Sequence, residues 1–238
     1  MKPILKIFSN TNEIAEEVAS ILNVLTSSTD NKSIHIALFG GNTPKKIFSC
    51  LKEKAGNKLA DKRVHFWWSD ERCVPPTDND SNYKWANELW LKPTGIPSTN
   101  IHRIKGENDP VNEAVRYSNE MGKWIEVKNA LPLFDLIMLG LGDDGHTASI
   151  FPNQMNLLIS GNWCEVSTNP VSGQKRITFT GKVINNASKV VFISTGERKA
   201  EMIKNVVIEA KPEYPASHIK PSNGEIIWLL DEEAARYL

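Results

Sequence analysis

Short apolar runs alternate with stretches of helical periodicity along the chain, and this alternation constrains the fold more than any other feature. The runs at 34–39, 64–68, 134–139, 189–193 and 226–230 are rich in branched and aromatic residues, which favour strands. Strands that alternate with helices form a mainly parallel sheet covered by helices on both faces. The sequence therefore predicts an α/β fold.

Apolar residues recur at helical spacing between these runs. The periodicity predicts helices over 12–26, 44–53, 82–91 and 110–127, and another that follows Thr195-Gly196-Glu197 and runs to about Glu209. Ser9, Asn10 and Thr11 are candidates to cap the first helix, because a side-chain oxygen there accepts from unpaired backbone N–H groups. Pro44 suits the first turn of the second helix, where its missing N–H would have no partner.

Length and composition favour a single domain over residues 1–238. The 238 residues are 40% hydrophobic, and no repeat, low-complexity tract or Gly/Ser linker divides them. Lys plus Arg and Asp plus Glu both total 28, so no global basic field attracts nucleic acid or an anionic membrane. We therefore expect local anion binding, with no nucleic-acid partner and no membrane partner.

The cysteines and the first residues predict a cytoplasmic location. Cys50, Cys73 and Cys164 are far apart and odd in number, which is typical of reduced thiols. Residues 1–10 contain no apolar stretch long enough for a signal peptide, and no run of about 18 apolar residues occurs anywhere. The five histidines show no paired spacing, so we expect no metal site.

The glycine-rich and polar motifs follow the predicted strands. In a parallel sheet, the loops after the carboxyl ends of the strands meet in one crevice, where ligands bind. Residues near 43, 72, 146 and 199 are therefore expected on one rim, although they are far apart in the sequence.

The first of these motifs, Gly40-Gly41-Asn42-Thr43-Pro44, joins a predicted strand to a helix. Such a junction leaves backbone N–H groups unpaired at the helix start, where the helix dipole also favours a phosphate. Thr43 adds a hydroxyl group. The motif is neither a Walker loop nor a Gly-x-Gly-x-x-Gly fingerprint, and an ordinary tight turn is the alternative.

Cations occur in three other segments, and those with Arg72 and Lys199 follow predicted strands. In Asp70-Glu71-Arg72, the guanidinium offers a planar set of donors for a carboxylate, a phosphate or an oxyanion, with either acid to steer it. Arg176 and Lys199 could likewise supply charge to a phosphate. Solvated surface charge is the alternative for each of them.

The strongest motif lies between Leu139 and Pro152 and contains Gly142-Asp143-Asp144-Gly145-His146. His146 follows a strand, at the start of an expected helix. An imidazole, whose ordinary pKa lies near neutrality, can take a proton from water and later return it. Because glycines and acids flank His146 at a strand end, a catalytic role is favoured over a structural one.

In this order the motifs resemble those of the 6-phosphogluconolactonase family, over roughly residues 36–204. Family members carry a Gly-Gly-Ser-Thr-Pro-like loop, matched with Asn42 for Ser, and an Asp-Glu-Arg followed by Ser-Asn, matched at 70–72 and 81–82. They carry Gly-x-Gly-x-Asp-Gly-His-Thr-Ala-Ser-Leu-Phe-Pro, matched at 140–152 with Ile150 for Leu. Their Arg-x-Thr-x-Thr and Gly-x-x-Lys patterns are matched by Arg176, Thr178, Thr180, Gly196 and Lys199.

The resemblance implies a Rossmann-like fold of the glucosamine-6-phosphate deaminase/isomerase type. It also implies hydrolysis of 6-phosphoglucono-1,5-lactone to 6-phosphogluconate in the oxidative pentose phosphate pathway, without a cofactor. By the same resemblance His146 is the general base for water, Asp144 orients it, and Arg72 holds the substrate near the reacting carbonyl. The expected substrate-binding and phosphate-binding residues are Gly40, Gly41, Asn42, Thr43, Asp70, Arg176 and Lys199.

Two rival functions fit the same fold. A glucosamine-6-phosphate deaminase typically continues after the His with Ile-Ala-Phe-Asn-Glu, whereas this chain continues with Thr147-Ala148-Ser149-Ile150. A non-catalytic sugar-phosphate sensor usually carries a DNA-binding module, for which this chain has no spare residues. Ammonia release tests the first rival, and ligand binding without turnover tests the second.

Overall fold

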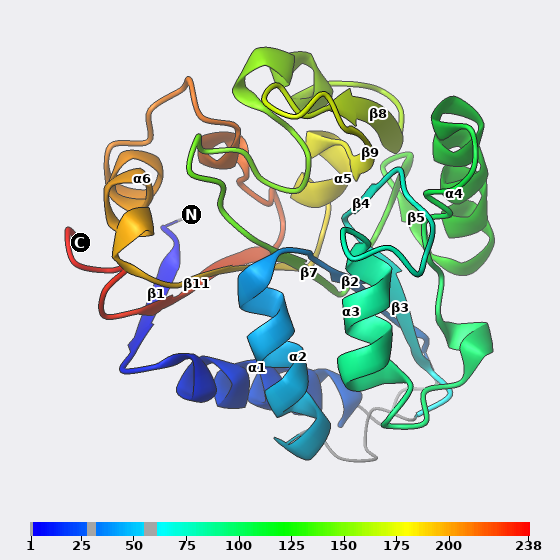
Figure 1. Ribbon diagram of the computed structural model, residues 1–238, viewed down its shortest axis with the longest axis horizontal. Coiled ribbons are helices and arrows are strands. Elements are labelled where there is room, and N and C mark those ends of the chain that lie inside the picture. Colours follow the sequence, from blue (N-terminus) through cyan, green and yellow to red (C-terminus); the bar gives the residue numbers. More distant parts are fainter. Residues whose placement is uncertain (1, 28–31, 55–60) are drawn as a thin grey trace.

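A six-stranded sheet forms the centre of the computed structural model, which describes residues 2–27, 32–54 and 61–238 (Figure 1). All its neighbouring strands are parallel, in the order β1-β11-β10-β7-β2-β3. The strands are β1 (Ile4–Phe8), β2 (Ile34–Leu38), β3 (Val64–Trp68), β7 (Leu136–Leu139), β10 (Lys189–Ser194) and β11 (Glu225–Asp231). The predicted mainly parallel sheet is confirmed.

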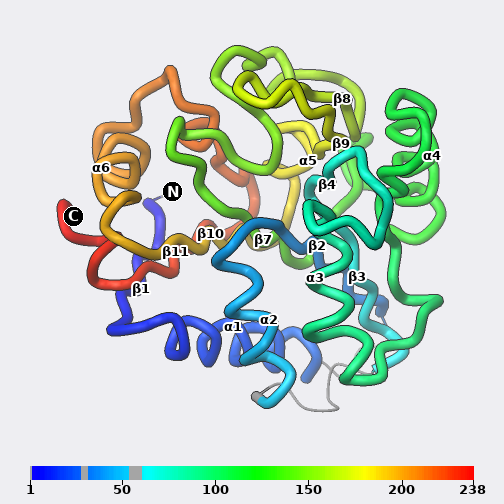
Figure 2. Tube along the Cα trace, viewed as in Figure 1, coloured from blue at the N-terminus to red at the C-terminus, as the bar shows by residue number. Residues whose placement is uncertain are grey.

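Helices cover both faces of this sheet, as predicted (Figures 1 and 2). The helices α1 and α2 pack together on one face, with α3 beside α2, whereas α5 and α6 lie on the other. Their bounds are α1 (Thr11–Thr26), α2 (Asn42–Lys54), α3 (Asn82–Ala86), α4 (Pro110–Trp124), α5 (Gly181–Asn185) and α6 (Ala200–Ile203). None of the helices that the structure describes is long and apolar enough to span a membrane.

Capping side chains fix the start of the longer helices. The side chain of Asn10 accepts from the backbone N–H groups of Asn12 and Glu13, at 2.9 and 3.1 Å. The Glu13 carboxylate in turn accepts from the backbone N–H of Ser9, at 3.1 Å, so the N–H groups on both sides of this turn have partners.

The predicted helix over 82–91 is realised as α3 followed by a π-helical turn (Asn87–Leu91).

A second, antiparallel sheet lies beside the main one and was not predicted. It consists of β4 (Asp70–Arg72), β9 (Lys175–Phe179) and β8 (Cys164–Thr168), in the order β4-β9-β8. Its strand β4 consists of three charged residues, so the apolar pattern that indicates a strand is absent from it. A short hairpin of β5 (Val127–Lys128) and β6 (Leu131–Pro132) follows α4.

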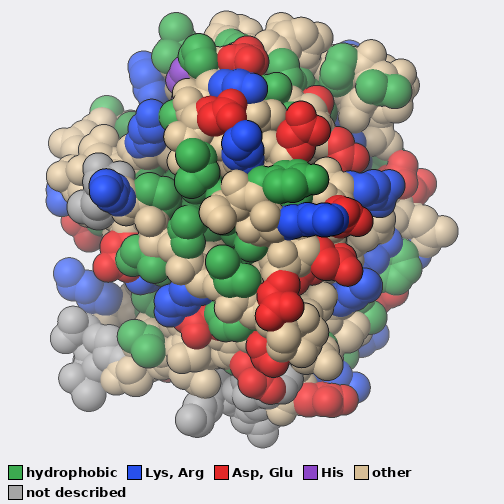
Figure 3. All heavy atoms as spheres, turned by 90° about the vertical axis from the view of Figure 1, so that its left-hand side faces the viewer, with side chains coloured by type: hydrophobic (Ala, Val, Ile, Leu, Met, Phe, Trp, Pro, Cys, Tyr) green, Lys and Arg blue, Asp and Glu red, His purple; other side chains and the backbone are tan. Residues whose placement is uncertain are grey.

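Three further expectations differ from the structure. The helix predicted over 110–127 ends at Trp124, because Ile125 adopts an extended conformation. His146 does not begin a helix: a turn follows it, and the next helical segment is a 3₁₀ helix (Pro152–Leu158). The edge strand β1 was not predicted, and its apolar side chains are partly exposed. Figure 3 shows the face of the molecule on the side of β1, where hydrophobic side chains reach the surface among charged ones.

The middle of the sheet is buried along its whole length. Every residue of β2 and of β3 is buried, which explains why these strands read as continuous apolar runs rather than as alternating ones. The indole of Trp67 packs against Tyr117 and Phe134, which in turn contacts Phe179 of the small sheet. The two sheets therefore share one core.

A cluster of histidines lies at the amino-terminal ends of β2 and β3. His65 Nδ1 lies 2.9 Å from His102 Nε2, and His102 Nδ1 lies 2.8 Å from a carboxylate oxygen of Glu120. The indole N–H of Trp67 donates to His35 Nδ1, at 3.2 Å. Burial, together with the charges of the neighbouring histidines, lowers the pKa of His35 to about 3, and burial with the charge of His102 lowers the pKa of His65 to about 4.

These shifts predict a loss of stability in mild acid. Below the ordinary histidine pKa of about 6.5, the unfolded chain binds protons at His35 and His65 that the folded chain does not bind. The free energy of unfolding should therefore fall as the pH falls from about 6.5 towards 4, by up to about 1.4 kcal/mol per pH unit for each group. His35→Gln should reduce this slope, measured by urea unfolding at several pH values.

The exposed His218 provides the matched control, because its replacement removes an imidazole outside the cluster. His218→Gln should keep the wild-type slope. An equal slope in His35→Gln and in the wild type would contradict the assignment.

Candidate active site

Four neighbouring strands, β10, β7, β2 and β3, end at one edge of the main sheet, and the loops that follow them form a cleft of about 470 Å³. The cleft brings together most of the residues that the sequence singled out. Among its lining residues are Gly40, Gly41, Asn42, Thr43, Asp70, Arg72, His146, Arg176 and Lys199. The expectation that residues near 43, 72, 146 and 199 share one rim is confirmed.

Asp144 and His146 form a hydrogen-bonded pair at the edge of this cleft. His146 Nδ1 lies 2.5 Å from the Oδ1 of Asp144, and the same oxygen accepts from the backbone N–H of His146, at 3.1 Å. Burial alone would raise the pKa of Asp144, but the hydrogen bond and charge of His146 outweigh it and hold that pKa below its usual value. In the neutral imidazole, Nδ1 carries the hydrogen, because a carboxylate only accepts, and Nε2 is the nitrogen with the free lone pair.

The backbone after β7 holds the imidazole in place. The N–H of Gly142 donates to the carbonyl of His146, at 2.8 Å, and closes the loop. The imidazole lies so close to this backbone that a Cβ on Gly142 would come within 2.1 Å of His146 Nδ1. Glycine is therefore required at 142 for this position of the ring. The hydroxyl of Thr147 donates to the carbonyl of Gly140, at 3.0 Å, and anchors the far side of the turn.

A buried polar network joins this loop to the small sheet. The hydroxyl of Ser149 donates to a carboxylate oxygen of Asp70, at 2.6 Å, and accepts from Arg176 Nη1, at 3.3 Å. Arg176 Nη1 lies 4.0 Å from Asp70 Oδ2, so the Asp70 carboxylate orients the guanidinium of Arg176 rather than that of Arg72. Burial lowers the pKa of Arg176, against the opposing effect of Asp70.

The ring of Phe151 packs against the imidazole of His146 and the guanidinium of Arg176. Its centroid is 4.7 Å from that of His146 and 5.6 Å from the guanidinium carbon of Arg176. The Phe151 side chain is itself buried, so its position is fixed by the core. One buried aromatic ring therefore lies between the imidazole of His146 and the guanidinium of Arg176 and contacts both. The sequence did not predict this contact.

Arg72 and Glu71 separate into two roles. Arg72 donates through Nη1 to the backbone carbonyl of Asp80, at 2.5 Å, and lines the cleft. The buried carboxylate of Glu71 instead accepts from the backbone N–H groups of Asn82 and Tyr83, at 2.7 and 2.8 Å, and thus holds the start of α3. Burial raises the pKa of Glu71 to about 7 despite these donors. The expectation that Asp70 or Glu71 steers Arg72 is therefore wrong.

The opposite side of the cleft combines hydroxyl groups, a cation and a helix start. The hydroxyls of Thr43 and Thr195 lie 3.2 Å apart, which links the first turn of α2 to the loop after β10. Lys199 forms an ion pair with Asp143. The first turn of the 13-residue helix α2 opens towards the same space, where its unpaired N–H groups favour an anion.

Within residues 2–27, 32–54 and 61–238, no three His, Cys, Asp or Glu side chains form a group that could hold a metal ion.

Comparison with known proteins identifies the family. A family model described as "Glucosamine-6-phosphate isomerases/6-phosphogluconolactonase" matches residues 9–228. The chain belongs to this family. It is similar to the 6-phosphogluconolactonase of Haemophilus influenzae, with 43% identity over 212 residues that cover 87% of this chain and 89% of that one.

Solved structures of this glucosamine-6-phosphate isomerase/6-phosphogluconolactonase family have the same fold. A structure described as "devB protein" superposes with a TM-score of 0.91 at 39% identity and covers 98% of both chains. The 6-phosphogluconolactonase of Trypanosoma brucei superposes with a TM-score of 0.90 at 26% identity and covers 100% of this chain and 99% of that one. The predicted glucosamine-6-phosphate deaminase/isomerase-like fold is confirmed.

Several residues in and beside the cleft were not among the predicted site residues. Ser149, Phe151, Asp143 and Thr195 each contact a residue that was predicted. The contacts of Ser149 and Thr195 join positions 79 and 152 residues apart, so no local pattern indicates them. Arg198 also lines the cleft.

Proposed function

We propose that this chain hydrolyses 6-phospho-D-glucono-1,5-lactone to 6-phospho-D-gluconate, the second step of the oxidative pentose phosphate pathway. The observation that carries the proposal is the Asp144–His146 pair, whose imidazole lines a cleft that also contains Arg72, Arg176 and Lys199. A base beside several cations suits a substrate with one electrophilic carbonyl and one phosphate. The 43% identity to a 6-phosphogluconolactonase supports the same substrate.

In the proposed mechanism, His146 Nε2 accepts a proton from a water molecule as the water oxygen attacks the lactone carbonyl. The carbonyl oxygen becomes an oxyanion, and Asp144 stabilises the imidazolium that has formed. When the oxyanion collapses, the bond from C1 to the ring oxygen breaks, and the imidazolium returns its proton to that oxygen. The product is an open chain with a carboxyl group, which ionises at neutral pH. The reaction needs no cofactor.

Different cations of the cleft bind different parts of the substrate. Arg72 holds the sugar near the reacting carbonyl and favours the developing oxyanion. Arg176, Lys199, Thr43 and the start of α2 bind the phosphate, with Asp70 and Ser149 holding Arg176 in place. Gly40, Gly41 and Asn42 supply backbone donors at the same helix start. The substrate is thereby fixed at both ends, which favours attack at one carbon.

We also propose the domain organisation, location and type of substrate of the enzyme. The chain acts as a single domain over residues 1–238, in the cytoplasm, on a small sugar phosphate and not on nucleic acid. Equal totals of 28 basic and 28 acidic residues support the absence of a nucleic-acid partner, because the chain has no overall positive field.

Replacing the base tests the proposal most simply. His146→Ala should lower kcat on freshly generated lactone by about 10²–10⁴-fold, after correction for spontaneous hydrolysis, while 6-phosphogluconate still binds. A coupled assay for 6-phosphogluconate measures the rate, and His218→Ala, on an exposed histidine, should retain wild-type turnover. Wild-type turnover in His146→Ala would refute the role of the base, and ammonia release from glucosamine 6-phosphate would favour a deaminase.

Lys199 tests the phosphate site separately. Lys199→Ala removes a charged donor, so KM for 6-phosphogluconolactone should rise by about 10- to 100-fold. The unphosphorylated glucono-1,5-lactone, which lacks the group that Lys199 binds, should show the same slow turnover in the variant and in the wild type. Lys182→Ala, an exposed lysine outside the cleft, is the control. An unchanged KM in Lys199→Ala would remove this residue from the phosphate site.

A further inference from the structure

A second concave region of the molecule lies outside the proposed active site. It is a groove of about 820 Å³ whose walls are the segment from Tyr83 to Lys92 on one side and α4 on the other. Between them runs the segment 101–105, which lies beside β3 through a parallel bridge between Ile101 and Phe66, and its Ile101, Arg103 and Lys105 line the groove. The groove and the cleft share no lining residue.

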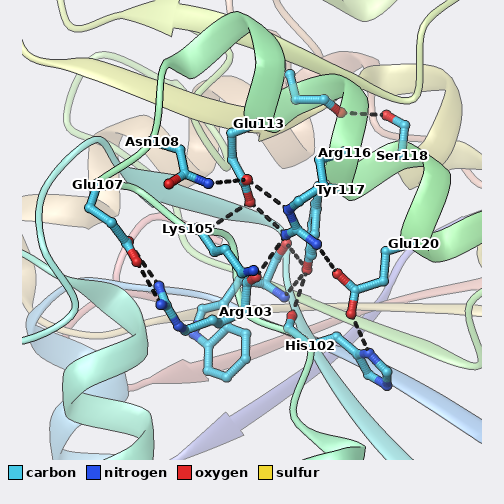
Figure 4. A network of polar contacts seen from close by, with 12 residues as sticks. His102, Arg103, Lys105, Glu107, Asn108, Glu113, Arg116, Tyr117, Ser118 and Glu120 are labelled. Carbon is cyan, nitrogen blue, oxygen red and sulfur yellow. Dashed lines mark hydrogen bonds and ion pairs between the residues drawn. The ribbon is translucent and has the colours of Figure 1, made fainter.

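Carboxylates hold the two arginines of the groove in fixed positions (Figure 4). Arg103 donates through both terminal nitrogens to Glu107, at 2.9 and 2.6 Å. Arg116 donates to the buried Glu113, at 2.7 and 2.6 Å, and is also paired with Glu120. Because these guanidiniums are already paired, they shape the groove more than they add free charge.

Three lysines of the groove provide unpaired positive charge. Within the part of the chain that the structure describes, Lys92, Lys105 and Lys123 have no carboxylate within ion-pair distance, and all three are exposed. They stand on three different segments around one concave space, so their charges converge there. The chain as a whole has no net charge, so this positive field is local.

An aromatic surface accompanies these charges. The indole of Trp124 also lines the groove, and 47% of this residue is exposed. Its ring is held by His65 and His102, whose centroids lie 5.0 and 5.2 Å away, so its position is fixed while part of it faces solvent. Ile96 and Ile101 add apolar surface beside it. A planar ring is the ligand group that such a surface accepts best.

We propose that this groove binds a nucleotide, with its phosphates on Lys92, Lys105 and Lys123 and its base on the indole of Trp124. A single inorganic phosphate would use the charges but not the aromatic surface, and a volume of about 820 Å³ lies in the range of ligand sites for molecules of nucleotide size. The groove is separate from the cleft, so this proposal does not depend on the proposed function.

Calorimetric titration with ATP, without divalent metal, tests this site on the full chain. ATP should bind with a Kd at or below about 1 mM. Lys105→Ala combined with Lys123→Ala should weaken it by at least about tenfold, and Trp124→Leu by a similar factor. Adenosine and inorganic tripolyphosphate, which each lack half of the ligand, should bind more weakly than ATP. Lys128→Ala combined with Lys182→Ala, two exposed lysines outside the groove, should leave the Kd unchanged.

Several outcomes would overturn the proposal. They are the absence of ATP binding at about 5 mM, displacement of ATP by 6-phosphogluconate, and equal binding of ATP and tripolyphosphate with no effect of Trp124→Leu. The first means that the groove is unoccupied by nucleotides, the second that ATP enters the cleft, and the third that the lysines attract any polyanion. Lactonase activity, measured without ATP in the same variants, should stay at the wild-type level, which separates this test from that of the proposed function.

Discussion

The hydrogen bond between His146 and Asp144 orients the imidazole in the cleft, and its place depends on where β7, a strand of the parallel sheet, ends. The loop that carries both residues follows β7, a central strand, and closes through the backbone bond between Gly142 and His146. The imidazole lies against the Gly142 backbone, where a side chain would displace it. With Nδ1 bound to a carboxylate, Nε2 is the nitrogen that remains for a substrate.

Charge in the cleft is positioned by contacts between the two sheets. The small antiparallel sheet begins directly after β3 and pairs Arg72 with Arg176 in register. The charge of Arg72 acts to lower the pKa of Arg176, and the Asp70 carboxylate, which accepts from Ser149, acts in the opposite direction. The arrangement leaves a pair of cations ready for an anionic substrate. Phe151, which contacts both His146 and Arg176, connects the imidazole to this cationic side.

Much of the main sheet could be predicted from the sequence, because buried parallel strands are continuous apolar runs with glycine-rich loops after them. The residues of those loops, from Gly40 to Lys199, were placed on one rim by topology alone. The small sheet and β1 were missed for opposite reasons. Strand β4 consists of three charged residues and has no apolar run, whereas β1 is apolar at all positions but Lys6 and is an edge strand with a partly exposed surface. Partners such as Ser149 and Asp70 lie 79 residues apart, so only the folded chain shows their contact.

A crystal structure of the chain with 6-phosphogluconate would show whether His146 faces the reacting carbon. We expect the product carboxylate within about 3.2 Å of His146 Nε2, directly or through one water molecule. We expect the phosphate at the other end of the cleft, in contact with Arg176 and Lys199. A product bound with its phosphate beside His146, or with its carboxylate out of reach of Nε2, would contradict these expectations.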